Sequence, residues 1–267
     1  MFIARSKSLI AACTRLNGNI ALVHPVTVST TLSPRFGITP LSFTIQRRLL
    51  STNNSPLCAN IKLDYFNIRG LAEPIRMVLH YGGVKFEDVR SPLPGWPPKM
   101  SESDKDKYRW GQVPCAVIDG KELYQSATIT RYFAGQCGLI PADPYLAALC
   151  DEYVDVQRDI MIAWAPAAFA PTAAKKRLLC DDIYRLTKPR FLDVFEKIIK
   201  GSSSGKHLVG DKMTWADIHM AYAFDHVEKL IEFDVIKDHP SMKKVCETVW
   251  NVPSLKKWKE TRPETPA

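Results

Sequence analysis

The order of strand and helix signals constrains the fold of this chain more than any other feature of its sequence. In its first third after residue 60, period-two and period-3.6 hydrophobic patterns alternate over short segments. The expected elements, in chain order, are a strand at 61–66, a helix at 71–81, a strand at 86–90, a strand at 115–118, a strand at 122–124 and a helix at 127–133. The run Asp119-Gly120-Lys121 is a hairpin signal. We therefore expect a small α/β domain of order β-α-β, loop, β-β-α.

The pattern changes at about Pro144, after which strand signals vanish and helical periodicity takes over. Helices are expected at 146–162, 177–200, 215–230 and 241–249. Thr214 and Asp217 form a capping box at the start of the third of these helices. The chain, with 267 residues of which 46% are hydrophobic, is long enough for this second, all-α domain beside the first.

The first 59 residues differ in charge from the rest of the chain. They hold six basic residues and no Asp or Glu, and so carry six of the net eight positive charges. With many Ser and Thr residues and the run Arg47-Arg48-Leu49-Leu50-Ser51, this composition is typical of a mitochondrial transit peptide. A secretory signal is disfavoured because the apolar run at 9–13 is short. We expect a removable presequence and a mitochondrial protein; a disordered tail or a mispredicted first exon, with a cytoplasmic location, remains the alternative.

The remaining composition excludes several classes of protein. Beyond residue 59 the net charge is small, which argues against a basic face for nucleic acid. The seven cysteines are an odd number without a C-x-x-C motif, so reduced thiols and no structural metal are expected. No apolar run approaches the roughly eighteen residues of a membrane span.

Three short stretches carry the residues suited to chemistry. Tyr65-Phe66-Asn67-Ile68-Arg69-Gly70 closes a strand, Gly111-Gln112-Val113-Pro114 opens another, and Gln125-Ser126 stands just before a helix. A hydroxyl such as that of Tyr65 can donate to an anion beside a helix N-terminus. The hydroxyl of Ser126 and the free N–H groups of its helix would suit a carboxylate. The structural alternatives are a packed strand tyrosine and an ordinary serine cap.

These stretches, in this order and context, resemble the glutathione pocket of cytosolic-type glutathione transferases. The resemblance is closest to the sigma class, which also includes glutathione-dependent prostaglandin D synthases. It covers about Asn60 to Pro266 and ends in Trp258-Lys259-Glu260-Thr261-Arg262-Pro263, which is similar to the C-terminal signature of that class. It implies an α/β plus all-α architecture, with a thioredoxin-like domain at 60–140, an all-helical domain at 141–267 and residues 1–59 as an extension.

The resemblance also implies roles for the residues of the three stretches. Tyr65 would donate its hydroxyl proton to the glutathione sulfur and so favour the thiolate, which is the nucleophile. A cis Val113-Pro114 bond would present the backbone of Val113 to the cysteinyl part of glutathione, and Gln112 would reach one end of the tripeptide. Gln125 and Ser126 would hold the γ-glutamyl carboxylate.

The remaining binding residues follow from less regular matches. Trp96-Pro97-Pro98-Lys99 resembles the Trp-Pro-x-x-Lys of the class, which holds the glycyl carboxylate, but Lys99 comes one residue early, so Lys107 or Arg109 could replace it. An Asp matching Asp159 reaches the γ-glutamyl ammonium of the partner subunit in sigma-class dimers, so a homodimer is expected. Some members bind a divalent metal at this interface, but Arg158 replaces one of its acids, and we expect no metal.

The leading hypothesis is therefore a transferase that conjugates glutathione to small apolar electrophiles. Phe66, Met161 and Trp164 are candidate walls of the electrophile pocket, with core packing as the equal alternative. Glutathione-dependent prostaglandin D isomerisation is a second hypothesis, disfavoured because Leu71 replaces an Arg that some such synthases carry. A third is a non-catalytic relative, such as a crystallin or a carrier of hydrophobic ligands.

Overall fold

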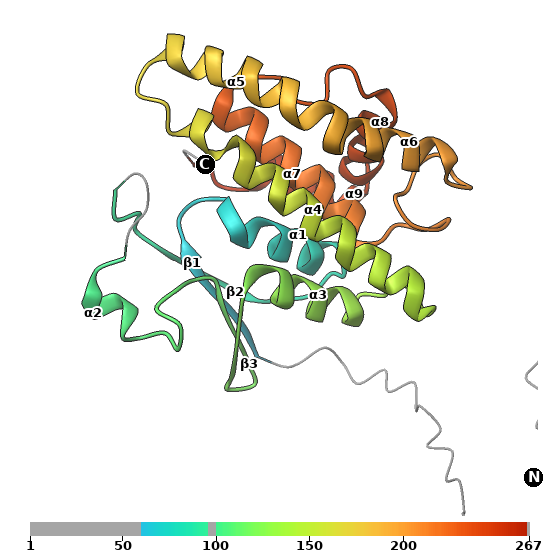
Figure 1. The fold of residues 1–267 in the computed structure, drawn as a ribbon. Helices are drawn as coiled ribbons and strands as arrows, with labels where there is room; N and C mark the ends of the chain where they lie inside the picture. Colours follow the sequence, from blue (N-terminus) through green and yellow to red (C-terminus); the bar gives the residue numbers. More distant parts are fainter. Residues whose placement is uncertain (1–59, 96–99, 266–267) are drawn as a thin grey trace, which may run out of the picture. The chain divides into compact units, whose positions relative to one another are not determined.

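The computed structural model describes residues 60–95 and 100–265 of the chain (Figure 1). Its sheet has four strands in the order β2-β1-β3-β4. The strands are β1 (Ile61–Phe66), β2 (Glu87–Ser91), β3 (Cys115–Ile118) and β4 (Lys121–Tyr124). β1 runs parallel to β2 and antiparallel to β3, and β3 and β4 form the predicted hairpin. Its two-residue loop places Asp119 and Gly120 at φ values of 46° and 79°, as this type of turn requires.

Three helices and one 3₁₀ turn belong to this α/β part: η1 (Gly70–Ala72), α1 (Glu73–Tyr81), α2 (Glu102–Lys105) and α3 (Ser126–Gln136). Pro74 lies in the first turn of α1, where its missing N–H has no intrahelical partner to lose. Ile75, Val78 and Leu79 are fully buried at the predicted helical spacing. The thioredoxin-like architecture expected from the sequence is thus confirmed.

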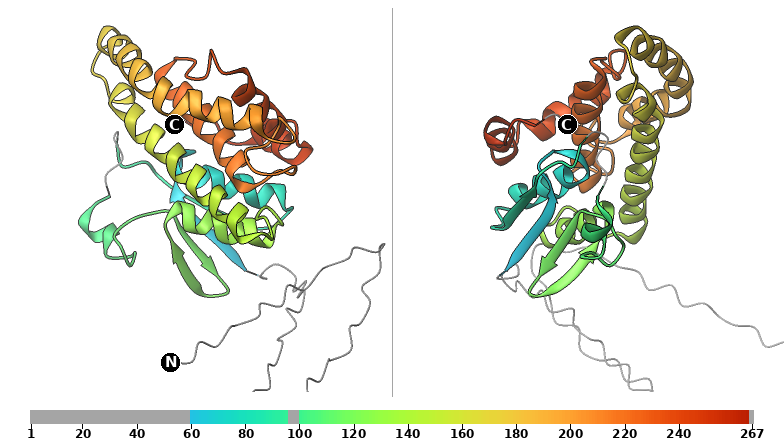
Figure 2. Two further views of the ribbon diagram at one scale, coloured as in Figure 1. Left: turned by 45° about the vertical axis from the view of Figure 1, so that its right-hand side comes forward. Right: turned by 90° about the vertical axis from the view of Figure 1, so that its left-hand side faces the viewer.

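Every regular element after residue 143 is helical within the described ranges, as predicted. The elements are α4 (Pro144–Ala168), α5 (Ala173–Thr187), η2 (Lys188–Leu192), α6 (Asp193–Gly201), α7 (Trp215–Ile231), α8 (Pro240–Trp250) and α9 (Pro253–Thr261). The two views of Figure 2 show α1 between the sheet and the helical part, where it packs against α7 and α9. In residues 60–95 and 100–265 no helix is both long and apolar enough to cross a membrane.

One helix prediction was wrong. A single helix was expected at 177–200, but a π-helical turn at Lys188–Leu192 separates α5 from α6. Pro189 lies in this turn and cannot donate a backbone hydrogen bond, which accounts for the interruption. The short α2 and the C-terminal α9 were not predicted.

The predicted capping box fixes the start of the central helix α7. The Asp217 carboxylate accepts hydrogen bonds from the backbone N–H groups of Thr214 and Leu208, each at 2.7 Å. Asp217 is fully buried, so these contacts satisfy a carboxylate that would otherwise be costly to bury. They also tie the loop before α7 to the helix.

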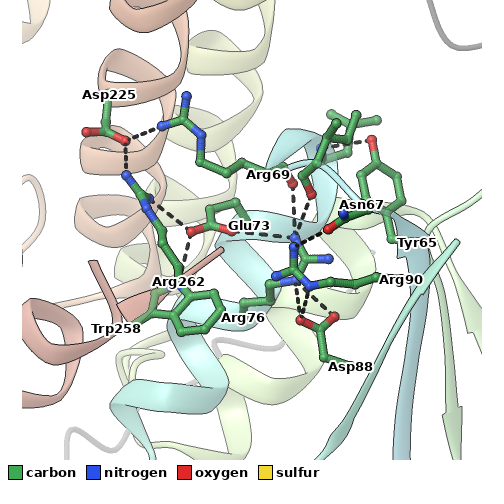
Figure 3. A network of polar contacts seen from close by, with 12 residues as sticks. Tyr65, Asn67, Arg69, Glu73, Arg76, Asp88, Arg90, Asp225, Trp258 and Arg262 are labelled. Atoms are coloured by element: carbon green, nitrogen blue, oxygen red, sulfur yellow. Dashed lines mark hydrogen bonds and ion pairs between the residues drawn. The ribbon is translucent and has the colours of Figure 1, made fainter. Parts of the chain in front are cut away.

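A buried ionic network joins the C-terminal helix to the α/β part (Figure 3). Arg262, at the end of α9, contacts Glu73 of α1 at 3.0 Å and Asp225 of α7 at 2.9 Å. The Trp258 indole N–H donates to the same Glu73 carboxylate at 2.9 Å, and Arg69 pairs with Asp225 at 2.8 Å. The Trp258 to Pro263 stretch singled out in the sequence therefore holds α9 against the segment that follows β1.

Candidate active site

Tyr65 lies at the carboxyl end of β1, where the chain turns into η1. Its hydroxyl oxygen accepts a hydrogen bond from the backbone N–H of Leu71 at 3.1 Å (Figure 3). Gly70 adopts φ of +38° directly beneath the ring, and a Cβ built there would lie 2.6 Å from the Tyr65 hydroxyl oxygen. A residue without a side chain is therefore needed at 70 for this ring position.

The electrostatics of Tyr65 keep its hydroxyl protonated. Burial raises the pKa of Tyr65, while the Leu71 N–H and the charge of Arg76 lower it by less, so the net shift is upward. A phenol with a pKa above its ordinary value of 10.0 is a donor at neutral pH. Because its oxygen already accepts from Leu71, its proton is available for another acceptor.

An apolar cavity of about 200 Å³ opens on the side of Tyr65 that faces the helical part. Its walls include Met161 and Trp164 of α4 together with His226 and Leu230 of α7. Both predicted wall residues of α4 thus reach the same cavity as Tyr65. Phe66 does not line this cavity; it lines the larger pocket between the end of β1 and the loop after β2, described below.

A small pocket of about 60 Å³, the Ser126 cavity, brings together the residues predicted to hold a tripeptide. It is lined by Gln112, Val113, Pro114, Gln125 and Ser126, joined by Leu71, Trp110, Tyr124 and Arg158. The Val113-Pro114 bond is cis, as predicted. Gln112-Val113-Pro114 and Gln125-Ser126 are separate in the sequence, but all five residues line one pocket.

Two details of the Ser126 cavity were not predicted. Helix α3 begins at Ser126 itself, so Gln125 and not Ser126 occupies the N-cap position. Gln125 has φ of 72°, a conformation that costs a residue with a side chain about 1–3 kcal/mol and that is often found at functional sites. Arg158 of α4 lines the same pocket as Ser126, the first residue of α3, and is a basic residue there. In the sequence analysis, Arg158 entered only as the residue that replaces a metal-binding acid.

A third pocket, the Lys107 cavity, lies between the end of β1 and the loop after β2. Its volume is about 390 Å³, and its lining includes Tyr65, Val113, Lys107 and Tyr108. The Tyr108 hydroxyl donates to Asp64 at 2.8 Å and fixes this wall. Of the two basic substitutes considered for the glycyl carboxylate, Lys107 lines this cavity, whereas Arg109 lies beside Glu122 at 3.7 Å. Trp96 and Lys99 lie outside the described residues.

The acidic residues of α4 line none of these three cavities. Asp151 pairs with Arg131 at 2.8 Å and Asp155 pairs with Arg158 at 3.4 Å. Asp159 is exposed and lines none of the three cavities. Across the described ranges no group of three or more His, Cys, Asp or Glu side chains is arranged to hold a metal ion.

The three cavities meet around Tyr65. Tyr65 lines the apolar and Lys107 cavities, Leu71 lines the apolar and Ser126 cavities, and Val113 lines the Lys107 and Ser126 cavities. A polar, charged ligand would fit along the second and third, and an apolar ligand would fit in the first. The fold thus defines a class of protein in which a thioredoxin-like domain is followed by a helical domain, and residues of both line cavities around one buried tyrosine.

Comparisons with known proteins identify the family. Residues 61–135 match the glutathione S-transferase N-terminal domain, and residues 158–262 match the glutathione S-transferase C-terminal domain. The chain is 36% identical over 209 residues to glutathione S-transferase 1 of Ascaris suum, which covers 77% of this chain and 98% of that protein. It is also 36% identical over 203 residues to glutathione S-transferase A4 of Mus musculus, covering 76% and 89%.

Solved structures agree with the sequence comparison. The glutathione S-transferase of Ascaris lumbricoides superimposes with a TM-score of 0.68 at 35% identity, covering 78% of this chain and all of that one. Prostaglandin synthase D of Nilaparvata lugens gives 0.67 at 30% identity, covering 77% and 100%. The chain belongs to the glutathione S-transferase family and is a glutathione transferase enzyme.

Proposed function

We propose that this enzyme conjugates reduced glutathione to small apolar electrophiles, with Tyr65 holding the sulfur as a thiolate. The observation that carries the proposal is the hydrogen bond from Leu71 N–H to the Tyr65 hydroxyl, 3.1 Å long, at the meeting point of a polar and an apolar cavity. It orients the hydroxyl so that its proton is left for the sulfur. A free thiol has a pKa near 8.5, so donation to the thiolate raises the fraction of nucleophile at neutral pH.

In this mechanism the tripeptide lies along the Ser126 and Lys107 cavities. The backbone of Val113 pairs with the cysteinyl unit, and Gln112 binds an end group. Gln125 and Ser126 bind the γ-glutamyl carboxylate, and Arg158, which lines the same cavity, strengthens that site with a positive charge that Asp155 partly balances. Trp96 binds the glycyl carboxylate together with Lys99 or with its substitute Lys107, which lines the Lys107 cavity.

The thiolate then attacks the electrophile held in the apolar cavity. Apolar walls bind a hydrophobic body without competing hydrogen bonds, and their exclusion of water strengthens the contact between Tyr65 and sulfur. The new carbon–sulfur bond forms as a leaving group departs or as a carbon–carbon double bond accepts the electron pair. The thiol proton has already passed to solvent.

We propose a sigma-type homodimer in which Asp159 completes the site of the partner subunit. Two large apolar side chains near site residues support an interface with a second copy. Trp110, close to Gln112, is 62% exposed, and Ile162, one helical turn from Asp159, is 68% exposed. Sedimentation of the full chain at micromolar concentration should give a dimer, and Ile162→Glu should dissociate it. A wild-type monomer would refute this assignment.

Prostaglandin D isomerisation is a second candidate, supported by the likeness to prostaglandin synthase D of Nilaparvata lugens. Leu71 disfavours this activity. It is an apolar residue that lines both the apolar and the Ser126 cavities, whereas some synthases carry Arg at this position. Incubation of the enzyme with prostaglandin H₂ and glutathione, followed by identification of the product, tests for isomerase activity. Prostaglandin D₂ at a rate above that of conjugation would favour this second activity.

Residues 1–59 lie outside the described residues, and we propose that they form a mitochondrial presequence ahead of domains at 60–140 and 141–267. The basic, acid-free composition supports this proposal. N-terminal sequencing of the protein isolated from mitochondria should find a start near residue 60. Recovery of an uncleaved chain from cytosol alone would refute it.

The decisive experiment compares the full-length protein with its Tyr65→Phe variant. Ultraviolet difference titration of bound glutathione should give a thiol pKa clearly below 8.5 in the wild type, and a higher pKa in the variant. Tyr145→Phe, which alters a tyrosine that is 72% exposed on α4, is the matched control and should leave the titration unchanged. Binding of glutathione without any dependence on Tyr65 would refute the mechanism.

A further inference from the structure

A cavity that the mechanism above does not use lies between the start of α5 and the loop after α7. Its volume is about 590 Å³, which is larger than each of the three cavities around Tyr65 and is typical of a small-molecule site. We call it the α5 cavity. Its charged lining residues are Lys176, Arg177, Asp181, Glu232 and Lys237.

These charged side chains are not paired with one another. In the described part of the chain none of the five takes part in an ion pair. Lys176 donates to the backbone carbonyl of Leu230 at 3.3 Å, and the Nζ of Lys237 lies 4.9 Å from the ring centroid of Phe233. An ammonium group has three N–H donors, so each of these contacts leaves donors free. Three cations and two carboxylates can therefore meet a ligand in this cavity.

The start of α5 adds backbone donors to the positive groups. Thr172 is the N-cap of α5, and Thr172 and Ala173 both line the cavity. The first N–H groups of a helix have no intrahelical acceptor, and the helix dipole favours an anion beside them. Lys176 and Arg177 lie one turn further along the same helix. A phosphate group suits this combination, because it offers several acceptor oxygens to basic side chains and to a helix start at once.

The two carboxylates argue against a ligand that is only an anion. Asp181 and Glu232 line the same cavity, and a bare phosphate would be repelled by both. Carboxylates accept hydrogen bonds from sugar hydroxyl groups, as an acidic residue does from ribose in dinucleotide-binding folds. Glu232 ends α7 with φ of 57°, a conformation that is uncommon for a residue with a side chain and is often found at functional sites.

Phe233 gives the cavity an apolar wall that is already in place. Its ring centroid lies 5.6 Å from that of Trp164 and 5.7 Å from that of Tyr184. Tyr184 is held in turn, since its hydroxyl donates to Asp238 at 2.7 Å. A wall that does not have to be ordered on binding lowers the entropic cost of association. It suits the carbon face of a sugar or a flat base.

We propose that the α5 cavity binds a phosphorylated sugar, either free or as the ribose phosphate of a nucleotide. The phosphate binds Lys176, Arg177 and the start of α5. The sugar hydroxyl groups donate to Asp181 and Glu232, and the carbon face packs on the aromatic wall. This site goes beyond the conjugation of glutathione, and none of the residues assigned to that reaction takes part in it.

The α5 cavity is a neighbour of the apolar cavity but does not share its charged groups. Ile231 lines both cavities, and Phe233 of the first packs against Trp164 of the second. Arg177 and Glu232 line none of the three cavities around Tyr65. Variants at these two positions should therefore keep the wild-type rate of conjugation, which also shows that they are folded.

The test is calorimetric titration of the full-length protein with ribose 5-phosphate, at saturating glutathione so that the cavities around Tyr65 are filled. Ribose 5-phosphate should bind at least about 10-fold more tightly than inorganic phosphate or ribose alone, because it contacts both sets of charges. Arg177→Ala should weaken its binding about 5- to 10-fold, the loss of a partly solvated charge-assisted contact. Arg185→Ala is the control, since Arg185 lies on α5, pairs with Asp182 at 3.3 Å and does not line the cavity. It should change the Kd by less than about 2-fold.

Glu232→Ala separates the two halves of the site. It should weaken binding of ribose 5-phosphate and leave the Kd of inorganic phosphate unchanged or lower. Equal Kd values for ribose 5-phosphate and inorganic phosphate, or an unchanged Kd for ribose 5-phosphate in Glu232→Ala, would overturn the inference. Absence of binding below about 1 mM for both ribose 5-phosphate and adenosine 5′-monophosphate would also overturn it, and would mean that the charges are only solvated. Tighter binding of adenosine 5′-monophosphate than of ribose 5-phosphate would identify a nucleotide, and equal binding would identify the sugar phosphate as sufficient.

Discussion

The backbone N–H of Leu71 donates to the hydroxyl oxygen of Tyr65 across 3.1 Å, which fixes the end of β1 against the turn that precedes α1. This contact depends on Gly70, since the chain can pass beneath the ring only where no side chain intervenes. The position of one hydroxyl is thus set by its neighbours along the chain as well as by the sheet.

Gly70→Ala should displace Tyr65. The added Cβ would lie 2.6 Å from the hydroxyl oxygen, and φ of +38° is unfavourable for alanine. We expect kcat/KM to fall about 10- to 100-fold, because a displacement of about 1 Å can cost that much. Stability should fall by about 1–3 kcal/mol. Gly83→Ala, at φ of +65° with no atom within 4 Å of its Cβ, is the control and should lose stability without comparable loss of activity. Equal losses of kcat/KM in Gly70→Ala and Gly83→Ala would contradict this prediction.

Arg158→Ala should weaken glutathione binding. Arg158 lines the Ser126 cavity, where the γ-glutamyl carboxylate is proposed to bind, and pairs with Asp155 at 3.4 Å. A charge-assisted contact that is partly solvated should raise KM for glutathione about 5- to 10-fold, with a smaller effect on kcat. Arg131→Ala removes a similar charge paired with Asp151 at 2.8 Å and should leave KM within about 2-fold. Equal changes in the two variants would show a general charge effect.

Arg262→Met should destabilise the whole fold. It removes both ionic contacts that bridge Glu73 and Asp225, and it leaves the Glu73 carboxylate, which is 1% exposed, with less compensation. Loss of one partner from a buried ionic network costs about 3–5 kcal/mol. Arg185→Met is the control, since its ion pair with Asp182 is exposed, and it should change stability by less than about 1 kcal/mol. Urea unfolding measures the loss of stability in each variant. Similar unfolding midpoints for Arg262→Met and Arg185→Met would refute the prediction.

Glu228→Gln should change the dependence of stability on pH. Burial first, and then the charge of Asp234, raise the pKa of Glu228 from 4.5 to about 7 in the folded chain. Since the folded state holds this proton more tightly, the stabilising contribution is complete below pH 4.5 and is lost as pH rises through 7.

The Gln variant keeps a carbonyl oxygen to accept the Val235 N–H, which lies 3.1 Å from Glu228, but it cannot ionise. Relative to wild type, its free energy of unfolding should therefore be higher at pH 8 than at pH 5, by about 1–2 kcal/mol because the site is partly solvated. Denaturant titrations at the two pH values supply the comparison. The opposite sign would mean that Glu228 is stabilised as a carboxylate in the folded state.

Prediction from the sequence succeeded where the signal is local. The strand at 61–66 matches β1, and Asp119 with Gly120 defines the β3–β4 turn, because both depend on residues that are neighbours in the chain. Thr214 and Asp217 form their capping contact for the same reason. The failure at 177–200 also has a local cause, since Pro189 in the sequence was given too little weight against a long helical periodicity.

Contacts between distant residues were decided by the tertiary structure. Arg262 meets Glu73 across 189 positions of sequence, and no local pattern encodes that pairing. Arg158 lines the Ser126 cavity, and His226 lines the cavity of Tyr65, because α7 packs against α1 and against α4. The sequence by itself determined most of the elements, their order and the chemical groups that the chain offers at the end of β1 and at the start of α3. Packing alone determined which of those groups share a cavity, because burial and long-range contact depend on the fold as a whole.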